Sequence, residues 1–185
     1  MKRGSFFILI IIFILAVGVG IGMFYFYFID QNTMEQRPLK TETSDAILRN
    51  YTYVRIFYPV GEDIEIIEKK VSSDLSRLEM ADYLISEYLK VSASMDTGVI
   101  PEGTSVNDVY ISRDNIVYID FNSPFKKNFR GDVIDEYMLI KTIYDTIIGN
   151  IEDLSDVAIL IDGKQTETLG GHFMISRPLK SIVGR

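Results

Sequence analysis

The chain has 185 residues, of which 47% are hydrophobic, and it carries no cysteine and a formal net charge of −7. This length suits one ordinary domain with an appendage rather than two full domains. Without cysteine, the chain cannot form a disulfide framework, a thiolate metal site or a cysteine-linked lipid anchor. The acidic balance argues against a nucleic-acid partner, because such proteins present a basic surface.

The first 30 residues predict a membrane anchor. Lys2 and Arg3 precede an apolar, uncharged run from Phe6 to Ile29, which is long enough to cross a hydrocarbon core of about 30 Å as one helix. Five consecutive aromatic residues near its end are typical of a membrane interface rather than of a signal-peptidase site. The two basic residues favour a cytoplasmic N-terminus. We therefore expect an uncleaved single-pass anchor over residues 1–30, contact with the cytoplasmic (inner) membrane through residues 6–29, and an extracytoplasmic C-terminal domain.

Small residues inside the apolar run suggest a second use for it. Gly18 and Gly22 are four residues apart, with Ala16 and Gly20 beside them. This spacing lets two membrane helices approach closely and dimerise. Glycine is also common in membrane helices that do not pair, so both interpretations stay open.

Residues 31–50 predict a flexible tether. They are polar, contain Pro38 with several Ser and Thr residues, and lack an apolar pattern that could form a core. The composition changes at Tyr51, and we expect one folded domain over residues 51–180.

The first half of this domain predicts two strands and a helix. The stretch YTYVRIFYP, which starts at Tyr51, is rich in aromatic and β-branched residues, and DIEIIEKKV follows it after a short turn. Ser76 and Glu79 have the spacing of a capping box at the start of a helix. The apolar positions of this helix repeat at helical spacing and comprise Leu78, Ala81, Leu84, Ile85, Tyr88 and Leu89.

The second half predicts a hairpin, a helix and a strand. SVNDVYIS and NIVYIDFN read as two short strands joined by a turn at residues 113–115. A helix follows Asp132 and ends near Gly149. DVAILID is the last clear strand, and HFMIS could add a final one. The apolar stripe of the second helix comprises Ile134, Tyr137, Ile140, Tyr144, Ile147 and Ile148.

The resulting order, β-β-α-β-β-α-β, predicts a small α+β domain. Two helices with one apolar stripe each cannot cover both faces of a five-stranded sheet. We therefore expect both helices on one face of a mixed sheet. The other face would be open to a partner.

Several of these stretches occur in an order that resembles the sporulation and spore germination (GerMN) domain family. They are YVRIFYP, the early helix, GVIPEGTSVNDVYISRDNIVYIDFNSPF, the second helix and VAILIDGKQTETLGGHFMISRPL. The resemblance covers roughly Tyr53 to Leu179. Its closing signature comprises Asp162, Gly163, Lys164, Leu169, Gly170, Gly171 and His172.

The resemblance implies an exported, membrane-attached, non-catalytic domain of the bacterial cell envelope. Domains of this family are similar to the ring-building modules of secretion systems, small α+β units that pack against one another. It implies envelope proteins or self-association as partners, in sporulation or germination. Related chains occur beside cell-wall amidases, which makes peptidoglycan binding the alternative. It implies no cofactor.

The only histidine, His172, follows the Gly170-Gly171 pair and could be a ligand, a base or an architectural residue. A catalytic or metal role needs convergent partners, and the chain offers neither a cysteine nor a second histidine. We therefore expect the glycines to supply a bend with positive φ or a close approach. His172 would then start the final strand and form a hydrogen bond across it.

Two acidic clusters could also indicate an enzyme. Paired carboxylates could serve glycoside hydrolysis, but solvated strand edges and a helix N-terminus explain these clusters more simply. Asp162-Gly163-Lys164 lacks the other residues of a phosphate loop and predicts a turn. We expect no catalytic, cofactor or metal site. The clusters are Glu62, Asp63, Glu65 and Glu68, and Asp132, Asp135 and Glu136.

Overall fold

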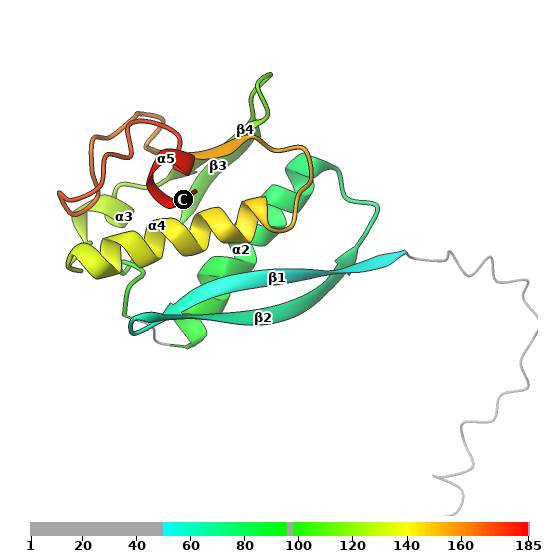
Figure 1. Ribbon diagram of the computed structural model, residues 1–185, viewed down its shortest axis with the longest axis horizontal. Coiled ribbons are helices and arrows are strands. Elements are labelled where there is room, and N and C mark those ends of the chain that lie inside the picture. Colours follow the sequence, from blue (N-terminus) through cyan, green and yellow to red (C-terminus); the bar gives the residue numbers. More distant parts are fainter. Residues whose placement is uncertain (1–49, 96–97, 185) are drawn as a thin grey trace, which may run out of the picture. The chain divides into compact units, whose positions relative to one another are not determined.

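The computed structural model describes residues 50–95 and 98–184, which belong to one compact unit from Leu48 to Arg185 (Figure 1). The predicted anchor over residues 1–30 and nearly all of the predicted tether lie outside the described residues. Among the helices of the described residues, none is both long and apolar enough to cross a bilayer.

A long hairpin opens the domain. Strand β1 (Tyr51–Val60) pairs antiparallel with β2 (Asp63–Ser72) along their whole length. Gly61 in the connection has a φ of +60°, a left-handed conformation that glycine adopts without strain. The inner face of β1 buries Val54, Ile56 and Tyr58. This part of the sequence prediction is confirmed.

Two helices form the centre of the domain, and both begin with a capping box. Ser76 and Glu79 cap α2 (Arg77–Ser94), as predicted from their spacing. Asp132 and Asp135 cap α4 (Val133–Ile148) in the same way. The predicted stripes are mostly buried, but Leu78 and Ile134 are exposed. Both exposed residues lie in the first helical turn, where the helix has not yet reached the core.

A three-stranded sheet completes the core. Strand β3 (Val106–Ile111) pairs antiparallel with β4 (Ile116–Phe121), and β4 pairs parallel with β5 (Asp156–Ile161). Val117, Ile119 and Phe121 of β4 are fully buried and alternate with partly exposed neighbours, as their sequence pattern predicts. Of two short helices, α3 (Pro124–Lys127) lies between β4 and α4, and α5 (Lys180–Val183) is the last element after β5.

The predicted single sheet with both helices on one face is wrong, although the α+β class and the element order are confirmed. The strands form two separate sheets, β1-β2 and β3-β4-β5. Helix α2 contacts β1 and β3, and α4 contacts β1 and β5, so the helices pack against both sheets (Figure 1). A helix between two layers needs a wide buried band, and α4 has one that extends from Glu136 to Ile147.

The predicted final strand at residues 172–176 is also wrong. After β5 the chain runs through bends and turns as far as α5. Leu169, Ile175 and Leu179 anchor this segment in the core, and the N–H of Leu179 donates to the carbonyl oxygen of Val157. We call residues 162–175 the closing loop.

Candidate functional site

The closing loop begins with a tight turn. Asp162 and Gly163 have φ values of +48° and +73°, and residues 161 and 164 form an isolated antiparallel bridge. The N–H of Gly163 also donates to Oδ1 of Asp120 at 2.8 Å. Two successive positive φ angles are typical of the turns that reverse a strand. The structure therefore places Asp162, Gly163 and Lys164 together in a turn at the end of β5.

The rest of the signature surrounds a buried carboxylate, that of Glu136. The N–H groups of Leu169 and Gly170 donate to its Oε1 at 3.0 and 2.9 Å. The N–H of His172 donates to Oε2 at 3.0 Å, and Nδ1 of the same residue lies 2.9 Å from Oε2. The side chain of Glu136 has no solvent exposure. One residue of α4 thus holds the Leu169–His172 segment through both oxygens.

The donors around Glu136 determine its charge. Burial by itself raises the pKa of this carboxyl, because the ionised form loses its water. Hydrogen bonds from Gly170, His172 and Leu169 oppose that effect, and together they hold the pKa below its ordinary value. The carboxylate is therefore ionised at neutral pH, and Nδ1 of His172 is its natural donor.

The two glycines of the signature meet different requirements. Gly171 has a φ of +103°, and a Cβ atom there would meet no atom within 4 Å. A Cβ atom on Gly170 would lie 2.6 Å from Cε1 of Phe129 and 3.0 Å from Oε2 of Glu136. Gly171 thus supplies backbone freedom and Gly170 supplies space. The wholly architectural role of the signature stays a prediction, which the variants below test.

His172 does not start a strand or form a hydrogen bond across one, as the sequence suggested. Its main chain turns toward Glu136, and its side chain is 43% exposed. A carboxylate that orients a histidine is also part of hydrolytic triads, which add a nucleophilic hydroxyl. In the described part of the chain, the His172 ring has a hydrogen bond to Glu136 and none to a Ser, Thr or Tyr hydroxyl.

Within the two acidic clusters, Glu136 is the residue whose buried surroundings differ from the solvated position that the sequence predicts. Glu62, Glu65 and Glu68 are exposed on the hairpin, and Asp132 and Asp135 cap α4. Within residues 50–95 and 98–184, no group of three His, Asp or Glu side chains could hold a metal ion. A signal for Glu136 was present in the sequence, because it shares the helical stripe of Ile140, Ile143 and Ile147.

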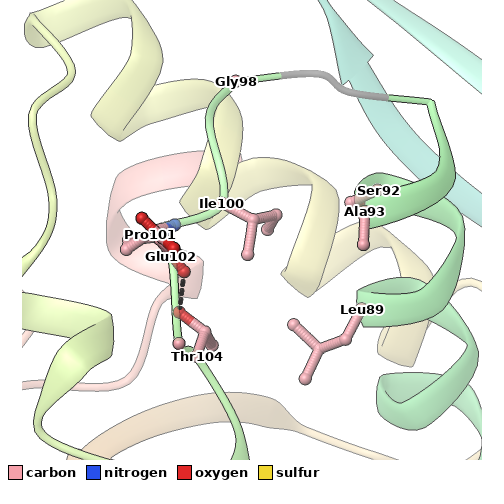
Figure 2. A pocket seen from close by; sticks show the side chains of 9 residues that line it. Leu89, Ser92, Ala93, Gly98, Ile100, Pro101, Glu102 and Thr104 are labelled. Atoms are coloured by element: carbon pink, nitrogen blue, oxygen red, sulfur yellow. Dashed lines mark hydrogen bonds between the residues drawn. The ribbon is translucent and has the colours of Figure 1, made fainter.

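A separate pocket of about 290 Å³ lies between α2 and residues 98–104. Its wall is mostly apolar, with Leu89 and Ala93 facing Ile100 (Figure 2). The hydroxyl of Thr104 donates to the carbonyl oxygen of Pro101 at 2.6 Å, which holds the loop in shape. The pocket shares no residue with the closing loop. Among the described residues that line it, only Glu102 has a titratable side chain.

Residues 25–167 match the Germane family, described as sporulation and spore germination. The fold is similar to that of a Clostridium perfringens protein assigned as a lipoprotein, with 20% identity over 71% of this chain and 88% of that chain and a TM-score of 0.48. No curated protein sequence matches the chain.

Two similar structures come from the sporulation protein GerM of Bacillus subtilis. The tandem GerMN domains show 20% identity over 71% of this chain and 48% of that chain, with a TM-score of 0.48. The first GerMN domain alone shows 21% identity over 67% of this chain and 92% of that chain, with a TM-score of 0.46. This chain thus spans about half of the tandem structure.

Proposed function

We propose, from the premise that this chain belongs to the sporulation and spore germination family, that it is a non-catalytic assembly module of the bacterial cell envelope. In this proposal an N-terminal helix anchors it in the cytoplasmic membrane, and the folded domain lies outside. Its partners are envelope proteins or further copies of itself, in sporulation or germination.

One observation carries the non-catalytic part of the proposal. Glu136 is the buried carboxylate that could act as a base, yet both of its oxygens accept hydrogen bonds from the closing loop. A general base must reach the proton that it removes, directly or through one water molecule. Both oxygens of Glu136 instead hold the closing loop in shape, which supports a structural role for this carboxylate.

The membrane topology gives the first test. If Lys2 and Arg3 keep the N-terminus in the cytoplasm, protease added to intact spheroplasts should degrade the domain. A cytoplasmic marker protein should stay intact in the same sample, which shows that the membrane is sealed. Complete protection of the domain, with degradation only after lysis, would contradict the extracytoplasmic location.

Peptidoglycan is the second candidate partner, and a stacked pair of tyrosines on the three-stranded sheet favours it. Tyr110 and Tyr118 face each other across β3 and β4 on the outer side of the sheet. Their rings stack with centroids 4.9 Å apart, and Tyr110 is 40% exposed. An aromatic ring offers an apolar face on which a sugar ring can pack.

A paired pull-down separates the two partner classes. We expect crosslinking in native membranes to capture envelope proteins with the chain, and purified sacculi to retain little of it. Tyr110→Ala should leave both results unchanged, with Tyr53→Ala as the matched control on the other sheet. Strong retention on sacculi that Tyr110→Ala abolishes, without any captured protein, would replace the assembly role with wall binding.

A further inference from the structure

The hairpin has two edges, and α4 closes one of them. The side-chain amide of Asn150 accepts from the N–H of Arg55 at 2.8 Å and donates to its carbonyl oxygen at 2.7 Å. Thr146 makes the same two contacts with Phe57, at 3.0 and 3.3 Å. Thr146 of α4 and Asn150, two residues after its end, thus form hydrogen bonds with the main-chain groups that β1 turns away from β2.

These contacts determine which groups β2 turns outward. In an antiparallel pair, opposite residues either exchange two hydrogen bonds or exchange none. The main-chain N–H and C=O groups of Arg55 and Phe57 are directed toward α4, so the same groups of their partners Glu68 and Ile66 must be directed away from β1. Because the direction alternates along a strand, the main-chain groups of Ile64 and Lys70 are directed away from β1 as well. Within the described residues, no hydrogen bond reaches these outward groups of β2.

The β2 edge has 10 residues and is longer than the other open strand edge among the described residues, that of β3 with 6 residues. The main chain of β5 is covered by the C-terminal segment, through Leu179 on Val157 and through the bridge between Ile161 and Lys164. Strand β2 is longer and stays uncovered within the described residues, and the side chain of Ile66 on it is 51% exposed. Unpaired strand edges are templates for another strand.

The charges on β2 select the strand that fits. Acidic residues occupy its first part, at Asp63, Glu65 and Glu68, and basic residues follow, at Lys69 and Lys70. Charges on an edge strand normally discourage pairing. Here their order is complementary to the same strand running in the opposite direction, because opposite charges on facing residues attract.

We propose that two copies of this chain pair antiparallel through their β2 edges, with Ile67 on the two-fold axis. To form hydrogen bonds, residues whose main-chain groups are directed outward must lie opposite each other, which places Ile66 opposite Glu68 and Ile64 opposite Lys70. Glu65 then faces Lys69 twice, with no like charges opposite. Pairing about Glu65, Glu68 or Lys69 would oppose like charges, and pairing about Ile66 would shorten the overlap.

The pair makes one four-stranded antiparallel sheet from two hairpins. This inference deepens the proposed function, and it rests on that proposal in treating the domain as an interaction module. It names the contact surface as β2 and the partner as a second copy. A shared patch that contacts itself across a two-fold axis is the usual design of a homodimer.

Disulfide trapping tests the register directly, because the chain contains no cysteine. Full-length Ile67→Cys, oxidised in membranes, should form a covalent dimer. Facing residues at a position without hydrogen bonds have Cα atoms about 4.5 Å apart, within disulfide range. Tyr53→Cys is the matched control, since Tyr53 is more exposed but lies on β1, the outer strand of the four-stranded sheet, away from the two-fold axis. It should remain monomeric, and equal crosslinking at both positions would overturn the proposal.

A second variant shows that the edge itself makes the contact. Glu68→Pro in the Ile67→Cys chain removes an outward N–H but spares the bonds to β1. Crosslinking should fall about tenfold or more, because symmetry removes two hydrogen bonds per pair. Glu68→Ala should crosslink normally, and circular dichroism should show that both variants are folded. A folded chain that captures envelope proteins but never crosslinks at Ile67 would overturn the dimer and leave the proposed function standing.

Discussion

Glu136→Gln should lower the free energy of unfolding by about 2–5 kcal/mol, because two N–H donors of the closing loop lose their acceptor and each buried donor left without a partner costs about 1–3 kcal/mol. The carboxylate accepts from three main-chain N–H groups and from His172, divided between its two oxygens. An amide keeps one oxygen but turns an NH₂ group toward two of these donors. Thermal or denaturant unfolding of the variant measures the loss.

Two control variants separate the carboxylate from its partners. Glu152→Gln makes the same chemical change at an exposed position and should have almost no effect. His172→Gln should cost at most about 1 kcal/mol, since the three main-chain donors remain and the amide can replace the one hydrogen bond of the imidazole. Equal losses for Glu136→Gln and Glu152→Gln would contradict a structural role for Glu136.

The same residue should make stability depend on acidity. Burial raises the pKa of Glu136, but hydrogen bonds from Gly170, His172 and Leu169 lower it below the ordinary value in the folded state. A group with a depressed folded pKa contributes stability above its unfolded pKa, and the contribution is lost as the pH falls toward the folded value. The stability gap between wild type and Glu136→Gln should therefore narrow on acidification below about pH 4.3.

Local signals were sufficient to predict most of the elements. The Ser76–Glu79 capping box begins α2, and the alternation of Val117, Ile119 and Phe121 marks the buried face of β4. These patterns depend on groups a few residues apart, which the sequence displays directly. The anchor over residues 1–30 stays a prediction.

The arrangement of the strands could not be predicted in the same way. Separation of the hairpin from the other sheet depends on Asn150 and Thr146, whose side chains take the place of a neighbouring strand. Residues 55 and 150 are far apart in the sequence, and no local pattern relates them. The assumption of one apolar stripe per helix also failed, because α4 is buried on more than one side.

The sequence indicated only one part of the candidate site. The Gly170-Gly171-His172 motif drew attention to the closing loop, but its counterpart Glu136 was assigned to a solvated helix N-terminus. Its position on the stripe of Ile140 and Ile143 was the available evidence. The final strand that the sequence predicts through HFMIS, at residues 172–176, is absent. The N–H groups of that region serve a carboxylate instead of a ladder.

Gly170→Val should destabilise the domain by about 1–3 kcal/mol through overpacking. Its new Cβ atom would lie 2.6 Å from the buried Phe129 ring, and Gly131 backs that ring, with its own Cβ position 2.7 Å from Cζ. The ring therefore has little room to move. Unfolding measurements on the purified full-length chain, compared with wild type, give the size of the loss.

A double-mutant cycle identifies the cause of that loss. Phe129→Leu shortens the side chain that Gly170 approaches, so Gly170→Val should cost less in that background than alone. Gly171→Ala is the matched control, because its penalty comes from its φ of +103° and not from contact. Phe129→Leu should leave that penalty unchanged. Additive losses for Gly170→Val and Phe129→Leu would show that the glycine is not kept small by the ring.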